Sequence, residues 1–514
     1  MRHLPRQNNS SMSFLVTLPD DILLTIALQL SIPDILSLKQ TCRVLHAFGG
    51  SDYLWHRLIE HFHFPLDIPQ SATFNNVPAD ELQKQAIKAL RLETNWRRPK
   101  STIKRSTVVQ DGIHESFVHM QFLPGGNYLL TVQRYHRLLM TRVTIRISVW
   151  SLTNIDHPII IFTTELEGII YRKSVIVDSD NAIAATLVIG IRDDRHDYIE
   201  IRSVPLVEST TSISPLASLS SYQSPSVRQV LLPAHPQVVG DRVIEHIFVA
   251  EGTMAVTVAI CEPRHLIELH ILLGNVHSGP LRWVDPKFTQ NLGSLQVRIQ
   301  QGRIFFLGQI GNTTVVRVYK QPSLADGQST TEFIDLGSPV ATYEQNLPLG
   351  LQYSSTENLH VPQRFSDTIP IFMFNVQDVR SRGHRSRSTG YVVYFKYSKV
   401  NCVSIQGDIE GAIHNACIPC TDESSQQLIQ LGTTGYRMVW IEHEMETGRN
   451  KVMKFEGRVQ EVKQPVIQYG LLLPPQPDLP FSLNACNSLA FDEVTGRVCL
   501  AFYEGSLHVL DFVD

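Results

Sequence analysis

The apolar residues of this chain change their spacing near residue 105, and this change limits the possible folds more than any other feature of the sequence. Before that point they recur every three or four positions, as in Ile22, Ile26 and Leu30, which is the spacing of one face of an amphipathic helix. After it, runs rich in Val, Ile, Thr and aromatic residues are separated by turn residues, which is typical of strands. We therefore predict a small helical region followed by a large all-β region that begins at residue 105.

The composition supports a folded protein in which sheet predominates. Of the 514 residues, 43 % are hydrophobic and only 18 % are charged, whereas about 25 % are charged in an average protein. A low charge density suits sheets, in which one residue in two faces water. The net charge is −4, so there is no basic excess that would attract nucleic acid. The seven cysteines are sparse and odd in number, which does not indicate a secreted disulfide framework.

No signal peptide and no membrane-spanning segment is predicted. The first residues are not followed by the apolar stretch of about 7–15 residues that a signal peptide needs. The most apolar window, residues 16–38, contains Asp20, Asp21 and Asp34. Near the centre of a bilayer each carboxylate would cost about 2.5–3.5 kcal/mol. We expect a cytoplasmic and/or nuclear protein with no membrane and no nucleic-acid partner.

Three stretches of the β region share a pattern of strand, tight turn and strand that resembles a blade of a WD-repeat propeller. They cover residues 122–152, 298–319 and 487–512, and weaker units lie near 171–206, 243–284, 391–415 and 427–460. About seven units leave roughly 59 residues each, more than the ~40–50 of a WD or kelch repeat, so long loops are expected. We predict a mostly antiparallel β-propeller of about seven blades, because closure into a ring protects the sheet edges. One or two β-sandwiches are the alternative.

The helical region carries an ordered set of residues that resembles an F-box. The set consists of Leu18-Pro19, Asp20, Ile22-Leu23, Asp34-Ile35-Leu36, Leu38, Cys42-Arg43 and Leu54-Trp55. Two positions depart from the family pattern, because Ala27 stands where an aromatic residue is usual and Leu45 where a tryptophan is usual. Both remain apolar, so we expect weaker partner packing rather than none. The alternative is a plain helical cap on the domain that follows.

These patterns divide the chain into four parts with an α+β multidomain architecture. We expect a disordered tail (1–15), an F-box (16–62), a helical linker (63–104) and a propeller-like substrate-recognition domain (105–514). Within the linker, residues 79–96 have helical spacing, with Asp80 as a candidate cap. We interpret this helix as a rigid strut that fixes the distance between two bound partners.

The whole layout resembles fungal F-box proteins with a long β-rich C-terminal region. The resemblance implies a substrate-recognition subunit of a ubiquitin ligase, in which the F-box binds a Skp-type adaptor held by a cullin scaffold and the β domain binds a target protein. It implies no enzyme activity, no catalytic residue and no cofactor in this chain. The residues expected to bind the adaptor are Leu18, Pro19, Ile22, Leu23, Ile26, Ile35, Leu36 and Trp55. Substrate-binding residues are not assigned.

Two alternative functions stay open at this point. One is an enzyme or carbohydrate-binding propeller with a helical cap, and the other is an F-box protein that acts outside ubiquitination. The sequence contains no P-loop, no dinucleotide-binding glycine motif and no nucleophile elbow. This absence disfavours an enzyme but does not separate the two F-box hypotheses.

Two partial metal motifs occur in the β region. Residues 417–420, Cys-Ile-Pro-Cys, have the spacing of a zinc or redox pair, with Cys402 and His414 upstream. No second tight pair of ligands follows, so we predict that they bind no metal. His443 and Glu444 begin a zincin-like motif, but Thr447 stands where the second histidine is needed.

Two charged stretches have both a functional and a plain interpretation. Arg380, Arg382, His384, Arg385 and Arg387 would suit an acidic or phosphorylated partner, or simply a solvated loop. Residues 192–197 are rich in both signs of charge, and we expect them at the tip of a hairpin rather than in a catalytic carboxylate pair.

Overall fold

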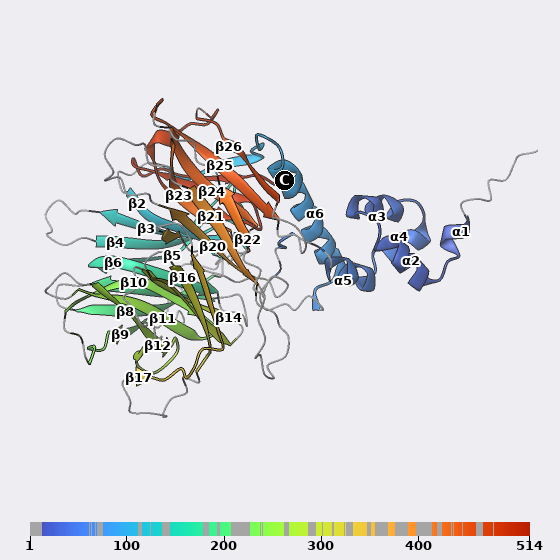
Figure 1. Cartoon of the computed structure of the whole chain (residues 1–514). Coiled ribbons are helices and arrows are strands. Elements are labelled where there is room, and N and C mark those ends of the chain that lie inside the picture. The colour runs from blue at the N-terminus through green and yellow to red at the C-terminus, as the bar shows by residue number, and fades with distance from the viewer. Residues whose placement is uncertain are drawn as a thin grey trace, which may run out of the picture.

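The computed structural model of the chain is shown in Figure 1. It describes residues 13–60, 62, 64–66, 68, 76–111, 116–123, 125–135, 144–177, 184–192, 196–206, 227–236, 238, 240–261, 267–285, 294–300, 302–310, 313–322, 324, 333–346, 351–354, 368–375, 389–396, 414–418, 424–432, 434, 436–444, 446–458, 466–475 and 477–513.

Six α-helices precede the first strand in the part of the chain that the structure describes. They are α1 (Ser13–Val16), α2 (Asp20–Ala27), α3 (Ile32–Lys39), α4 (Arg43–Gly49), α5 (Asp52–Glu60) and α6 (Ala79–Trp96). Helix α3 begins as its sequence predicts, because the Ser31 hydroxyl accepts a hydrogen bond from the Asp34 amide and Pro33 lies in the first turn. Helix α1 begins at Ser13, so the last residues of the expected disordered tail are helical, and residues 1–12 lie outside the described part.

Seven sheets follow the helices, and six of them contain four strands. The sheets are β2 (Ser116–Phe122), β3 (Tyr128–Tyr135), β4 (Thr144–Ser151) and β5 (Ile159–Glu167); β6 (Ile169–Val177), β7 (Ala184–Arg192), β8 (Asp197–Pro205) and β9 (Val227–Leu231); β10 (Asp241–Ala250), β11 (Thr253–Cys261), β12 (Ile267–Asn275), β13 (Arg282–Val284) and β17 (Phe333–Ile334); β14 (Ser294–Gln300), β15 (Arg303–Ile310), β16 (Thr313–Lys320) and β18 (Ala341–Asn346); β19 (Leu351–Ser354), β20 (Thr368–Asn375), β21 (Thr389–Lys396) and β22 (His414–Ile418); β23 (Ser424–Leu431), β24 (Arg437–Glu444), β25 (Arg449–Arg458) and β26 (Val466–Leu473); and β27 (Cys486–Asp492), β28 (Arg497–Phe502), β29 (Leu507–Asp511) and β1 (Arg105–Gln110). A short 3-10 helix, Leu483–Ala485, precedes β27.

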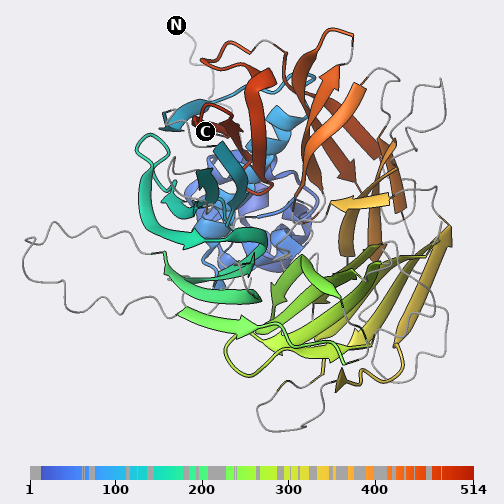
Figure 2. The same cartoon turned by 90° about the vertical axis from the view of Figure 1, so that its left-hand side faces the viewer.

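The sheets are the blades of a β-propeller, and Figure 2 shows them arranged as a ring. Strand β10 lies beside β6 and β14, and β27 lies beside β2 and β23, so first strands of neighbouring blades meet at the centre. All strand pairs are antiparallel except β13 with β17. This arrangement confirms the predicted propeller of about seven blades and excludes the sandwich alternative.

The ring is closed by strands from the two ends of the β region. Strand β1 pairs with β29, with Arg105 opposite Asp511 and Thr107 opposite Val509. The last strand is therefore held between β28 and β1. Apolar side chains fill the spaces between blades; one such cluster joins Val188 and Ile199 to Ile247 and Val256. No helix among the described residues is long and apolar enough to cross a membrane.

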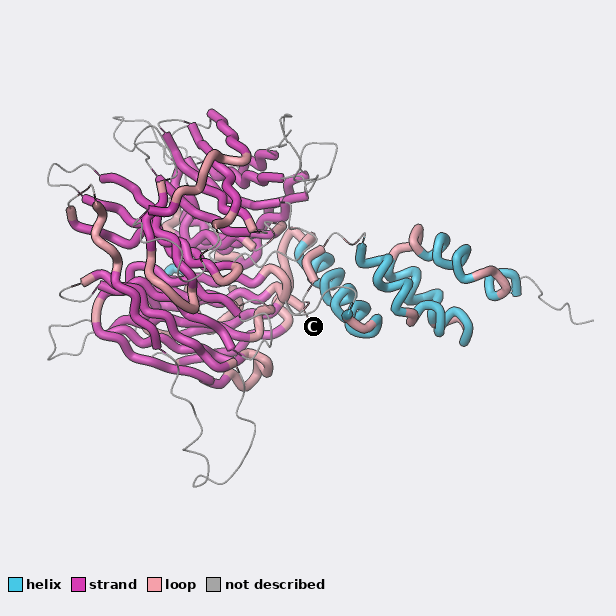
Figure 3. The backbone as a smooth tube through the Cα atoms, turned by 90° about the horizontal axis from the view of Figure 1, so that it is seen from below, coloured by secondary structure: helices cyan, strands magenta, loops and turns pink. Residues whose placement is uncertain are grey.

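All six helices lie on one face of the propeller and project away from it (Figure 3). In Figure 2 they lie behind the ring, so the two views agree. Helix α6 is the element that joins the other helices to the ring. The opposite face of the ring is not covered by any described helix.

Candidate functional site

Helix α2 presents an exposed apolar pair at its surface. Ile22 and Ile26 are four residues apart, so they lie on one face of the helix, and 44 % and 36 % of these residues are exposed. Pro19, just before the helix, is also exposed, and Leu18 is half-buried. Exposed isoleucines side by side are unfavourable in water and are typical of a surface that a partner covers.

The other predicted adaptor-binding residues contribute to the core of the helical region. Leu23, Ile35 and Trp55 are 3 %, 1 % and 0 % exposed. The Trp55 indole N–H donates a hydrogen bond of 2.8 Å to the Gly49 carbonyl, which satisfies its polar atom internally. Leu36 is partly buried against the same core. Burial leaves Leu23, Ile35 and Trp55 almost no surface for a partner, so adaptor contact stays a prediction for the more exposed members of the set.

Three exposed apolar residues were not predicted as part of this surface. Leu15, Val44 and Tyr53 are 38 %, 49 % and 61 % exposed. Leu15 was missed because it falls in the expected tail, although its apolar character next to Leu18 was a signal. Val44 and Tyr53 begin helices α4 and α5, where one apolar residue does not reveal which face is exposed.

The N-terminal half of α6 shares a core with the F-box helices. Leu82, Ala86 and Ala89 pack in one cluster with Trp55 and Ile59 of α5. A carboxylate caps the start of α6, but it comes from α5: the Ala79 amide donates to Asp52 Oδ1 at 2.7 Å. The prediction that Asp80 caps this helix is therefore wrong, because Pro78 occupies the cap position and no local side chain accepts there. Helix α6 and the F-box helices form one packed unit.

The C-terminal half of α6 packs into the propeller. Leu92 and Trp96 belong to a core cluster with Val452, Leu500 and Phe512, so they touch the last two blades. A side chain at Gly496 would clash with Leu92, because an added Cβ would lie 2.4 Å from Leu92 Cδ1. Gly496 also has a φ of +72°, which glycine adopts most readily. The turn between β27 and β28 thus requires glycine where the helix crosses it.

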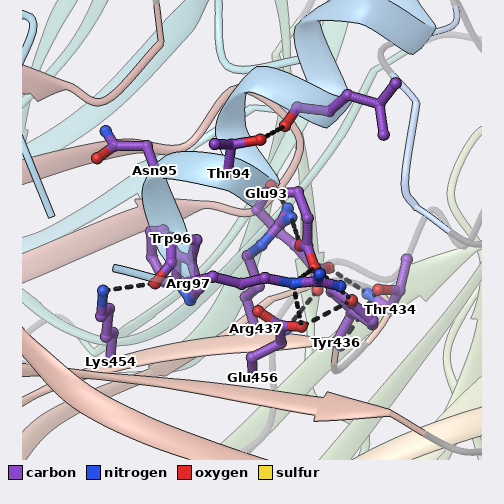
Figure 4. Close-up of polar contacts among 12 residues, drawn as sticks. Glu93, Thr94, Asn95, Trp96, Arg97, Thr434, Tyr436, Arg437, Lys454 and Glu456 are labelled. Atoms are coloured by element: carbon purple, nitrogen blue, oxygen red, sulfur yellow. Dashed lines mark hydrogen bonds and ion pairs between the residues drawn. The ribbon is translucent and has the colours of Figure 1, made fainter. Parts of the chain in front are cut away.

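A buried charged network, which we call the joint, connects α6 to the blade of β23–β26 (Figure 4). Glu93 of α6 accepts a hydrogen bond of 2.8 Å from the buried Arg437 guanidinium and one of 2.6 Å from Arg97. The Tyr436 hydroxyl lies 3.3 Å from Glu93 Oε1 and 3.0 Å from Glu456 Oε1. Burial and the nearby Glu93 together raise the pKa of Glu456 to about 7.

The end of α6 is held by a lysine from the propeller. The Lys454 ammonium donates its three hydrogens to the Trp96 carbonyl, the Arg98 carbonyl and the Ser101 hydroxyl. A cation at a helix C-terminus satisfies carbonyls that have no partner within the helix. Burial lowers the pKa of Lys454 to about 8.

A second set of bonds ties the same turn to the ring-closing blade. The Asn95 amide donates to the Phe512 carbonyl at 2.8 Å and to the Thr102 carbonyl at 2.7 Å, and its oxygen accepts from the Thr102 N–H. Helix α6 is therefore attached both to the blade of β23–β26 and to the last strand region of the propeller.

A half-open cleft lies beside the joint. Its volume is about 400 Å³, and it is lined by Trp96, Arg97, Arg98, Pro99, Lys454, Glu456, Tyr469 and Gly470. Glu456 lines this cleft, although only 3 % of the residue is exposed.

The partial chemical motifs of the sequence do not assemble into a described site. No group of three or more metal-ligating side chains occurs among the residues that the structure describes. Of residues 417–420, Cys417 and Ile418 are the last two residues of β22. Pro419 and Cys420 lie outside the described residues. The basic cluster at 380–387 also lies outside them. Burial raises the pKa of the Cys486 thiol to about 12, which makes it unreactive.

The charged stretch at 192–197 contains an ion pair at the base of a hairpin. Arg192 in β7 donates two hydrogen bonds, of 2.7 and 2.8 Å, to the carboxylate of Asp197 in β8. The two residues are opposite each other in the strand pairing. Both groups are thus used to hold the hairpin, as expected; residues 193–195 lie outside the described part.

Residues 15–61 match the family model described as F-box-like, so the chain carries an F-box-like domain at its N-terminal end, followed by a β-propeller. F-box domains generally bind Skp-type adaptors, and F-box proteins are typically non-catalytic adaptors. No match was found among curated protein sequences.

Several solved structures are similar to the chain. The β-propeller domain of Cps50 (Swd1) from Myceliophteria thermophila is 10 % identical with a TM-score of 0.41, covering 80 % of this chain and 98 % of that one. An oligogalacturonate lyase in complex with manganese is 9 % identical with a TM-score of 0.42, covering 79 % and 90 %. The WD40 domain of SCAP from fission yeast is 8 % identical with a TM-score of 0.38, covering 79 % and 94 %.

Proposed function

We propose that this chain is the substrate-recognition subunit of a cullin-based ubiquitin ligase. Its F-box binds a Skp-type adaptor, the adaptor binds the cullin scaffold, and the propeller holds a target protein. The chain itself carries out no chemistry in this proposal. It raises the effective concentration of the target near the ubiquitin-charged enzyme and fixes its orientation.

The observation that carries the proposal is the position of helix α6 in two cores at once. Its first half packs with α5, and its second half, through Leu92 and Trp96, packs with the propeller. Its 18 residues span about 27 Å at 1.5 Å per residue. A continuous helix buried at both ends transmits the position of the F-box to the propeller, as a molecule that works by positioning requires.

The arrangement leaves two surfaces for two partners. The exposed pair Ile22 and Ile26 is at the F-box end of the molecule, and the uncovered propeller face is at the other end. Adaptor and target could therefore bind together without overlapping.

The proposal is tested by affinity purification of the tagged full-length chain followed by mass spectrometry. The double variant Ile22→Asp/Ile26→Asp should lose both the adaptor and the cullin but keep the proteins bound through the propeller. Ile159→Asp/Ile160→Asp is the matched control, because these residues of β5 are 46 % and 50 % exposed and lie in the propeller. This control should keep the adaptor and the cullin.

Two results would decide against the ligase proposal. If wild-type chain retains the adaptor without any cullin, the protein acts with the adaptor outside ubiquitination. If no adaptor is retained at all, the helices are a cap on the propeller. If the proposal is right, the Ile22→Asp/Ile26→Asp variant still binds its target proteins. In cells that carry this variant, those target proteins lose their ubiquitin conjugates.

A further inference from the structure

The joint contains two carboxyl groups that are too close to be ionised together without cost. Glu93 belongs to α6 and Glu456 to β25, and Arg97 Nε lies 2.6 Å from Glu93 Oε1 and 3.9 Å from Glu456 Oε1. Two buried carboxylates this close repel each other, so the charge of Glu93 raises the pKa of Glu456. The arrangement therefore favours one proton more than the full ionisation of both groups would leave.

The tyrosine between them leads to the same conclusion. The Tyr436 hydroxyl lies within 3.3 Å of Glu93 and 3.0 Å of Glu456, but a phenol has one hydrogen to donate. When the Tyr436 hydroxyl donates its hydrogen to one carboxylate, its oxygen can only accept from the second carboxyl group. The second contact is therefore favourable when that carboxyl group carries a proton and donates it to the phenol oxygen. Glu93 lies 2.8 Å from Arg437 and 2.6 Å from Arg97, whereas Glu456 Oε1 lies 3.9 Å from Arg97. Glu456 is the group that holds the proton.

We propose that Glu93, Tyr436 and Glu456 form a proton-controlled latch that sets how firmly the F-box and α6 are held against the propeller. With the proton present, the three side chains make a continuous set of hydrogen bonds between α6 and the blade of β23–β26. When the proton leaves, two carboxylates face each other across one phenolic hydrogen, and the last turn of α6 separates more easily from the blade.

The surroundings of Glu456 allow it to exchange its proton while the joint remains folded. It lines the cleft of about 400 Å³ beside the joint, which is open to solvent. The titratable and charged groups around it are Glu93 and Arg97 on α6, Arg98 after the helix, Tyr436 and Arg437 at the start of β24, Lys454 on β25 and Tyr469 on β26. No described histidine is among them.

The direction of the pH dependence follows from linkage. The pKa of Glu456 is about 7 in the closed joint and 4.5 in its ordinary state. Between these two values the closed joint binds one proton more than the open joint. Opening should therefore become about tenfold more favourable for each pH unit as the pH rises through this range, and it should level off near pH 7. Above pH 8 the deprotonation of Lys454 would add a second effect, so the useful range ends at about pH 7.5.

The experiment is hydrogen–deuterium exchange of the full-length chain between pH 5.5 and 7.5. The amides of the last turn of α6, residues 92–97, are followed, and each rate is divided by that of an unstructured peptide of the same sequence at the same pH. In the wild-type chain the opening constant should rise about tenfold from pH 5.5 to 6.5 and then level. In Glu456→Gln, which keeps the oxygen that accepts from Tyr436 but cannot titrate, it should be independent of pH.

Glu442→Gln is the matched control. Glu442 is a buried carboxylate of β24 in the same blade, and it pairs with Lys451 of β25 at 3.1 Å. This variant should keep the wild-type pH dependence. A flat wild-type profile, or the same slope in Glu456→Gln as in wild type, would overturn the proposal, and the wild-type profile decides the matter even if a variant does not fold.

The latch would also set how firmly the adaptor on the F-box is held relative to the target on the propeller. This consequence rests on the proposed function. The exchange experiment needs neither partner, so the two proposals fail separately. A chain that binds no adaptor can still show the pH-dependent joint, and a pH-independent joint leaves adaptor binding untouched.

Discussion

Replacing Ile22 and Ile26 by aspartate should abolish adaptor binding while the chain stays folded. The two residues are 44 % and 36 % exposed, so part of each side chain is still available for burial by a partner. Full burial of an isoleucine contributes about 1.5–3 kcal/mol, so the exposed fractions account for about 1–2 kcal/mol together. Each buried carboxylate without a partner adds at least about 1–3 kcal/mol of cost. The sum is about 3–8 kcal/mol, so the Kd should weaken by at least about a hundredfold.

The free energy of unfolding should change much less than the binding free energy. The two side chains already face water, and surface substitutions of this kind usually change stability by less than about 0.5 kcal/mol. Position 22 is also in the first turn of α2, which begins with Asp20 and Asp21, so another carboxylate there is compatible with the helix dipole.

Isothermal titration calorimetry with a purified Skp-type adaptor measures the binding, and thermal unfolding measures the stability of the same samples. The control pair Ile159→Asp/Ile160→Asp carries the same chemical change at similar exposure on β5 and should bind like wild type. If the α2 variant binds within threefold of wild type at unchanged melting temperature, this face of α2 is not the docking surface. An equal loss in the β5 control would show a general effect of added charge instead.

Three further changes test the joint, the ring closure and a buried histidine. Glu93→Ala leaves the buried Arg437 guanidinium without its carboxylate, so the free energy of unfolding measured by urea titration should fall by about 3–5 kcal/mol. In the control Glu81→Ala, at a half-exposed position of the same helix, it should fall by less than about 0.5 kcal/mol. Deleting residues 505–514 removes β29 and leaves β1 and β28 as open edges, so soluble yield should fall, and unchanged yield and melting temperature would contradict closure. Burial lowers the pKa of His508 below its ordinary 6.5, so the folded state disfavours its charged form; the melting temperature should fall from pH 7 to pH 5.5, and less so in His508→Phe.

The elements with a strong period were predictable from the sequence. Helix α6 was expected over residues 79–96 and has these bounds, because its apolar residues keep helical spacing for five turns before Arg97-Arg98-Pro99. The number of blades was also predictable, since seven units of strand-forming segments separated by turn residues recur along the β region. The added strand β17 was not, because it has two residues and joins the blade of β10–β13 by pairing with β13, although β14, β15 and β16 of the next blade lie between them in the chain.

The docking residues were only partly predictable. A family pattern marks apolar positions without stating why they are apolar, and in a module this small the same kind of residue fills the core and the surface. Trp55 illustrates the difficulty, because its indole is fully buried and hydrogen-bonded to Gly49, although it stands in the pattern beside exposed residues. Ile22 and Ile26 differ from the buried residues of the pattern by their exposure. This exposure depends on how α2 is rotated against the other helices, which the sequence does not state.

The joint could not be read from sequence at all, and the reason lies in the charge of its members. Glu93 occupies a position in α6 where the pattern predicts a solvated residue, yet it is 3 % exposed. It is buried against Arg437, which follows it by 344 residues in the chain and donates a hydrogen bond of 2.8 Å to it. Burial of such a pair contributes little net stability compared with apolar residues of the same size, since both charges lose their water. What the pair does provide is geometry: the guanidinium accepts one orientation of the helix, whereas an apolar contact would tolerate several. The proposed function, which is to hold two partners at a fixed distance, needs that restriction, and this gives a physical reason for charged residues where the helices meet the propeller.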